Sequence, residues 1–118
     1  MAIEMGMSNE FIIGVHGEVT FDGKQLAGMF PHEQVKLAQK AGVDIFGPVI
    51  NTNSSHSFPW NLARAVTFVK LTVEESSIPV HVNAGMGVCS VPMQPTPPID
   101  CVSRMSKAMV HIAKIDGL

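Results

Sequence analysis

The sequence predicts an α/β protein built from three consecutive parallel βα units, and we expect these units to form part of a (β/α)8 barrel of the TIM type. Short apolar segments of strand length alternate with longer segments of helical periodicity. The middle apolar segment is almost continuously hydrophobic, which is typical of a parallel strand buried on both faces. Right-handed βα units place their helices on one face of the sheet, so the other face needs further strands or a partner. We therefore expect a fragment of a larger barrel or an obligate homo-oligomer.

The composition limits the class of protein. A length of 118 residues allows one domain over residues 1–118, in which we expect residues 1–10 to be a flexible N-terminal segment. The eight Lys and Arg residues are scattered and the formal net charge is -2, which argues against nucleic acid as a partner. No apolar run approaches the roughly 18 residues of a membrane helix. The N-terminus lacks the pattern of a secretory signal, so we expect a cytoplasmic protein with no membrane partner.

The first unit consists of an apolar strand over residues 11–16 and a helix over about residues 31–41. Pro31 suits the first turn of a helix, and Gly42 suits the left-handed position just after its end.

The second unit begins with the predicted buried strand at residues 42–50, which leads into a polar loop at residues 51–57. A long helix is predicted from about residue 59 to residue 75. Its apolar positions are spaced four, three and four residues apart, at Leu62, Val66, Val69 and Val73.

The third unit begins with a predicted strand at residues 78–83. Thr96 and Pro97 suit the N-cap and first position of the final helix. Gly117 suits the end of that helix, and Leu118 would then be the first residue of a fourth strand that is missing. The predicted buried face of the helix consists of Val102, Met105, Met109 and Ile112.

Side-chain alternation divides the third strand into two faces. Val80 and Val82 point one way, and His81 and Asn83 point the other. If the valines face the helices, the two polar side chains face the interior of the barrel. His16 would lie on the same interior face of the first strand, where it could converge with His81 or Asn83.

The stretch Gly85-Met86-Gly87-Val88-Cys89 follows the third strand directly. Active groups of parallel α/β proteins collect where strands end, and the glycines would let the backbone approach a ligand closely. Cys89 is therefore either a nucleophile or metal ligand, or an ordinary small residue in a structural loop. Cys101 lies inside the final helix, where packing explains it.

Three further residues are candidates for acid–base catalysis. His16 and Glu18 could act as a pair, because imidazole titrates near neutral pH and a carboxylate orients it. His81 is a comparable candidate. The alternative for each is a solvated polar residue at the end of a strand.

Amides and glycines supply the candidates for ligand binding. Amide side chains offer both donors and acceptors without charge, which suits the orientation of a polar ligand, but they also suit turns and caps. The candidates are Asn51, Asn53, Asn83, Gly85 and Gly87.

Several cofactor motifs are absent from the sequence. The Gly85–Gly87 turn is not a dinucleotide fingerprint, because Ser90 stands where the third glycine would be. The sequence contains no P-loop, no Cys-x-x-Cys or His-x-x-x-His pair, and no Asp-x-His-x-x-Gly signature of corrinoid-carrying domains. We assign no metal site, and the sequence identifies no cofactor.

Residues 41–92 resemble part of the monomethylamine corrinoid methyltransferases. In those barrel enzymes a Gly-Met-Gly-Val run precedes pyrrolysine, which presents the methylamine to a corrinoid protein; here Gly85-Met86-Gly87-Val88 precedes Cys89. The whole chain also resembles an uncharacterised archaeal family from methanogens, a domain of unknown function, of which it would be a partial length.

The resemblance implies a barrel scaffold, a reactive group at a strand end, a small-molecule substrate and a corrinoid protein as partner. A thiol cannot form the imine-type adduct attributed to pyrrolysine, so we do not carry methylamine chemistry over from the resemblance. Our leading hypothesis is a partial, methyltransferase-like barrel that lacks full activity on its own, because catalytic barrels draw residues from several strands. The rival is a non-catalytic α/β module that self-associates through its uncovered sheet face.

Overall fold

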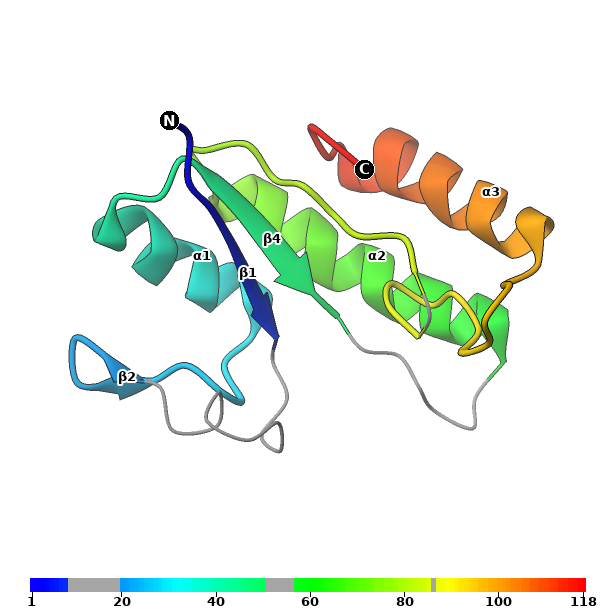
Figure 1. Cartoon of the computed structure of the whole chain (residues 1–118), viewed down its shortest axis with the longest axis horizontal. Coiled ribbons are helices and arrows are strands. Elements are labelled where there is room, and N and C mark those ends of the chain that lie inside the picture. The colour runs from blue at the N-terminus through cyan, green and yellow to red at the C-terminus, as the bar shows by residue number, and fades with distance from the viewer. Residues whose placement is uncertain (9–19, 51–56, 86) are drawn as a thin grey trace.

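The computed structural model describes residues 1–8, 20–50, 57–85 and 87–118. Strands and helices follow one another along the chain as shown in Figure 1. Their bounds are β1 Glu4–Ser8, β2 Thr20–Phe21, β3 Lys24–Gln25, α1 Pro31–Ala41, β4 Ile45–Val49, α2 Phe58–Glu75, α3 Ile99–Ala108 and the π-helix η2 Met109–Ala113.

Four segments lie side by side and run in the same direction. β1 pairs with β4 in parallel, with Gly6 opposite Gly47. The extended segment after α2 lies next to β4 through a parallel bridge between Phe46 and Val80. The end of the chain lies next to that segment through a parallel bridge between His81 and Gly117. The order across these segments is therefore β1, β4, the segment around residue 80, and the segment around residue 117.

The strands differ in part from the predicted ones. The predicted strand at residues 42–50 is shorter, because Gly42 caps α1 and β4 begins only at Ile45. The predicted strand at residues 78–83 is extended but joined to its neighbours by single bridges. The predicted strand at residues 11–16 lies outside the described residues. Residues 4–8, which we had assigned to a flexible segment, form β1.

Helix α1 has the predicted bounds. Pro31 occupies its first position, and the carboxylate of Glu33 accepts a hydrogen bond from the backbone N–H of Phe30 at 3.2 Å. The helix ends at Gly42, whose φ of 85° lies in the left-handed region that glycine adopts without strain. Proline at the start and glycine after the end therefore fix both ends, as the sequence indicated.

Helix α2 begins one residue earlier than predicted and ends at the predicted residue. Val66 and Val69 of the predicted stripe are buried, and Leu62 and Val73 pack against the same core while partly exposed. The helical spacing of these four residues thus identified the packed face of α2 correctly.

The start and end of the final helix were predicted wrongly. Pro98 is the N-cap and α3 begins at Ile99, two residues after Pro97. The left-handed residue at the end of η2 is Lys114, with φ of 62°, and not Gly117. Gly117 instead bridges His81. A prolyl residue restricts the residue before it to extended conformations, so the second proline of the pair delays the helix.

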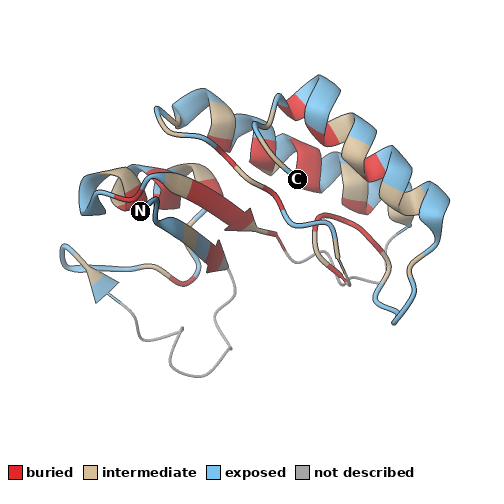
Figure 2. Cartoon of the chain, turned by 45° about the horizontal axis from the view of Figure 1, so that its top comes forward, coloured by how far each residue is buried: buried red, intermediate tan, exposed pale blue. Residues whose placement is uncertain are grey.

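All helices pack on one side of the parallel segments, and most of the buried residues lie between the two layers (Figure 2). Val80 and Val82 are buried against α2, α3 and η2. Met7 and Phe46 are buried against α1. Within the described residues, no helix has the length and apolar character needed to cross a membrane.

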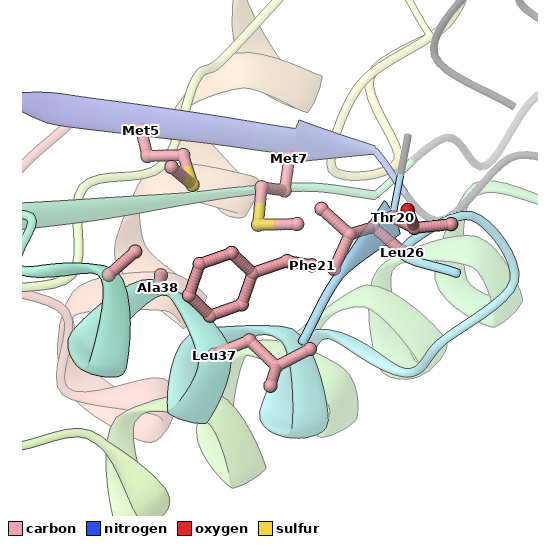
Figure 3. A pocket seen from close by; sticks show the side chains of 8 residues that line it. Met5, Met7, Thr20, Phe21, Leu26, Leu37 and Ala38 are labelled. Atoms are coloured by element: carbon pink, nitrogen blue, oxygen red, sulfur yellow. The ribbon is translucent and has the colours of Figure 1, made fainter. Parts of the chain in front are cut away.

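A small apolar cavity of about 150 Å³ lies between β1, the β2–β3 hairpin and α1. Figure 3 shows Met5 and Met7 pointing into it from β1, with Phe21 of the hairpin opposite. Leu37 and Ala38 of α1 complete the wall. This cavity lies on the helix side of the sheet, so it is separate from the face that carries the polar residues.

Candidate functional site

The sheet face opposite the helices carries the polar residues predicted for it. Val80 and Val82 are fully buried on the helix side. His81, which lies between them, is partly exposed, and Asn83, which follows Val82, is exposed. The alternation along this segment is therefore as predicted, and His81 and Asn83 point away from the helix layer.

His81 has a carboxylate partner that the sequence analysis did not identify. Its Nδ1 lies 2.7 Å from Oε1 of Glu4, which belongs to β1 at the other side of β4. The two side chains meet above Gly47, the residue of β4 that lies between them. A Cβ atom at position 47 would lie only 3.1 Å from Oε1 of Glu4 and 3.5 Å from the carbonyl oxygen of His81. Glycine at position 47 therefore leaves room for the contact.

The alternation of β1 could have revealed Glu4. Met5 and Met7 pack against the core on the helix side, so Glu4 and Gly6 must lie on the opposite face. The segment is short and contains glycine, a residue depleted in strands, and for that reason its pattern is weak.

The turn at residues 85–91 lies at the carboxyl end of β4, where the sequence placed a candidate site. The backbone N–H of Cys89 donates to the carbonyl of Ile50 at 2.9 Å, and that of Gly87 donates to the carbonyl of Val91 at 2.9 Å. Gly87, Cys89 and Ser90 all have positive φ, at 73°, 52° and 80°. Left-handed backbone at non-glycine residues is strained and is common at functional sites.

The side chain of Cys89 points into the core. It is fully buried in the same cluster as Val82 and Ile50. Burial raises the pKa of the Cys89 thiol to about 12, and the hydrogen bond with Ile50 offsets only part of this effect. The thiol is therefore protonated and shielded from solvent at neutral pH, which are poor conditions for a nucleophile or a metal ligand. Cys101, on α3, is partly exposed.

The remaining predicted residues have different positions. Gly85 is partly exposed and Gly87 is buried, both in the turn that holds Cys89. His16, Glu18, Asn51 and Asn53 lie outside the described residues. Of the predicted catalytic residues, His81 and Cys89 can thus be placed. They lie on opposite sides of the sheet, because His81 belongs to the uncovered face and Cys89 to the core.

Within residues 1–8, 20–50, 57–85 and 87–118, no three His, Cys, Asp or Glu side chains are grouped as a metal would require. The pair formed by Glu4 and His81 offers two donors, and structural metal sites use four.

Comparison with known proteins gives one family. The model of a family described as dimethylamine methyltransferase matches residues 1–118, which is the whole chain. No solved structure matches the chain significantly. The match confirms the resemblance to a methyltransferase family.

Proposed function

Since the chain belongs to the dimethylamine methyltransferase family, we propose that it takes part in the transfer of a methyl group from a small methylated amine to a corrinoid protein. The observation that carries this proposal is the family match over all of residues 1–118. Dimethylamine is the substrate in the family's description, and monomethylamine is the alternative that the sequence resemblance suggested. An origin in an archaeal methanogen remains a prediction.

We further propose that the four parallel segments belong to a (β/α)8 barrel. The parallel pairing of β1 with β4, the parallel bridges at Val80 and Gly117, and the helices on one side support this architecture. In such a barrel the face with Glu4 and His81 would be the interior, and the turn after Asn83 would lie at the carboxyl rim, where barrel enzymes hold their sites.

The corrinoid would come from the partner protein. The chain lacks the Asp-x-His-x-x-Gly signature of corrinoid-carrying domains. A corrinoid that is bound to its carrier protein accepts a methyl group. The residues of this chain would then bind and orient the amine. Asn83 is exposed on the uncovered face next to the rim, and it is our candidate for hydrogen bonding to a polar substrate.

Cys89 has a structural role in this proposal. It is buried under the rim, and its backbone ties the turn at residues 85–91 to the end of β4. The position that pyrrolysine occupies in the resembling enzymes is therefore occupied here by a core residue, and we derive no reaction step through it.

The composition of the uncovered face disfavours the rival hypothesis of a self-associating module. The face presents Glu4, Gly6, Gly47 and His81, and a large apolar patch would be expected for stable association.

The proposed function is tested by incubating the purified chain with dimethylamine and free reduced cobalamin. We expect monomethylamine and methylated cobalamin to form in equal amounts, at a rate above that of a buffer blank. A parallel reaction with monomethylamine, which would give ammonia, distinguishes the two substrates. The variant Glu74→Gln, which changes an exposed residue of α2, serves as the control. If the folded chain gives no rate above the buffer blank with either amine, the proposal is overturned.

A further inference from the structure

Glycines surround His81 on the uncovered face. The register places Gly6 opposite Gly47, and the bridge between Phe46 and Val80 places Gly47 level with His81. On the other side His81 is opposite Gly117. Across four adjacent segments, this level therefore consists of three glycines and one histidine. Barrel interiors are normally filled at each level by bulky side chains, so this level leaves open space around the imidazole.

The contact with Glu4 fixes the proton on the imidazole ring. An ionised carboxylate can only accept hydrogen bonds, so Nδ1 of His81 must carry the proton that it shares with Oε1 of Glu4 at 2.7 Å. In the neutral ring the other nitrogen, Nε2, then has a free lone pair and can accept a hydrogen bond.

The ring of His81 lies beside Gly117. A Cβ atom at position 117 would lie 3.2 Å from Cδ2 of His81 and 3.8 Å from Cγ. Glycine therefore leaves room beside this part of the ring. The side chains of His81 and Glu4 are 33% and 42% exposed, so a small molecule can reach both.

We propose that Glu4 and His81 bind a small alkylammonium ion and hold it in its protonated form. This proposal rests on the proposed function, which supplies the class of substrate. A secondary amine is protonated at neutral pH, and one N–H of the ion donates a hydrogen bond to Nε2 of His81. The proton stays on the amine nitrogen, which is the stronger base, so the C–N bond can break with release of a neutral amine. The carboxylate of Glu4 attracts the positive charge of the ion.

The two residues have distinct roles in this step. His81 touches the substrate and is the catalytic residue. Glu4 acts through His81, so it is a positioning residue, and its negative charge also attracts the cation. Asn83 lies two residues further along the same face, so the pair lies one level below the rim where the amine would enter.

The experiment is a ¹⁵N NMR titration of the imidazole of His81 with dimethylammonium chloride. We expect the free protein to show a protonated Nδ1 and an unprotonated Nε2, and the Nε2 signal to shift as this nitrogen accepts a hydrogen bond from the added dimethylammonium. Tetramethylammonium has the same charge but no N–H bond, and it should leave this signal in place. Glu4→Gln removes the charge and should weaken the response to dimethylammonium about fivefold. The control Glu74→Gln should respond as the unaltered protein does.

Each outcome separates this inference from the proposed function. An Nε2-protonated ring in the free protein, no response to dimethylammonium, or equal responses to the two salts would each overturn the inference. In the methyl-transfer assay, folded His81→Gln should have a kcat/KM about tenfold lower. Unchanged methyl transfer by this variant would overturn the inference and leave the proposed function in place. A response specific to dimethylammonium without any methyl transfer would support the inference and overturn the proposed function.

Discussion

Glu4 and His81 are 77 residues apart in the sequence, and Oε1 of the first lies 2.7 Å from Nδ1 of the second. The contact spans the width of β4, where Gly47 leaves room for the carboxylate. It joins the first strand to the third parallel segment. Gly47 therefore keeps open the space in which a carboxylate and an imidazole meet on the uncovered face.

Substitution of Gly47 tests this relationship. We expect Gly47→Ala to displace the carboxylate of Glu4 slightly and to weaken its contact with His81, because the added Cβ would lie 3.1 Å from Oε1 of Glu4. The free energy of unfolding should change little, since the loss of a partly exposed ion pair costs about 0.2–1 kcal/mol and replacement of glycine by alanine stabilises by about 0.4–1 kcal/mol. The ¹⁵N spectrum of His81 should show a mixture of tautomers while the melting temperature moves by a few degrees at most.

Gly6→Ala is the matched control for this prediction. Gly6 is opposite Gly47 on the neighbouring strand, but a Cβ atom there would meet nothing within 4 Å. Its spectrum should be that of the unaltered protein. A single tautomer in Gly47→Ala would show that the glycine is not required for the contact.

The burial of Cys89 predicts its reactivity toward thiol reagents. Cys101 is partly exposed and Cys89 is fully buried with a pKa of about 12, so Cys101 should be labelled much faster at neutral pH. The variant Cys101→Ser retains only the thiol of Cys89. Labelling of that thiol should become complete only after denaturation. Mass spectrometry of the labelled chain measures both rates. Fast labelling of Cys89 in the folded protein would contradict the buried position.

The same thiol predicts a loss of stability in alkaline solution. The pKa of Cys89 is raised from 9.0 to about 12, so the unfolded chain loses this proton at a lower pH than the folded chain does. The contribution to stability is therefore complete below pH 9 and is lost as the pH rises toward 12, by an amount on the order of 4 kcal/mol. Urea unfolding at a series of pH values should show this loss, and Cys89→Ala should lack it. Parallel pH curves for the two proteins would refute the assignment.

Helices were predicted better than strands, for a physical reason. The ends of α1 depend on local chemistry, namely proline at the start and a left-handed glycine after the end, and both are visible in the sequence. The bounds of α2 followed from the spacing of its apolar residues. Such signals involve residues within a few positions of each other, so one sequence is enough to detect them.

The strands and the site depend on contacts between distant segments. β1 is a strand because it pairs with β4, and nothing local in its five residues requires that conformation. For the same reason His81 was identified as a candidate but its partner Glu4 was not. Cys89 was placed correctly in the turn after the third segment, but the direction of its side chain depends on packing against Val82 and Ile50. The sequence could not show that packing.

An ion pair between the first two helices gives a prediction in acid. Lys36 of α1 lies 2.9 Å from Glu75 of α2, and its hydrogen bond and charge hold the pKa of Glu75 below the usual 4.5. The pair therefore stabilises the fold above that pH, and the contribution is lost as the pH falls through the lowered value. Lys36→Gln should raise the pKa of Glu75 in a ¹³C NMR titration of the carboxyl groups. The control Lys70→Gln, which alters an ion pair within α2, should leave the titration curve of Glu75 unchanged. An unchanged titration curve of Glu75 in Lys36→Gln would refute the pairing.

Substitution of Gly117 separates access to His81 from the pairing with Glu4. A Cβ atom at position 117 would lie 3.2 Å from Cδ2 of the ring, so the ring can accommodate alanine only by shifting slightly, while the branched side chain of Gly117→Val would crowd the ring beside Cδ2, the carbon next to Nε2. We expect Gly117→Val to keep the protonated Nδ1, because Glu4 approaches from the opposite side across β4. Its response to dimethylammonium should fall well below that of Gly117→Ala. Equal responses in the two variants, with both proteins folded by circular dichroism, would mean that the amine approaches His81 by another route.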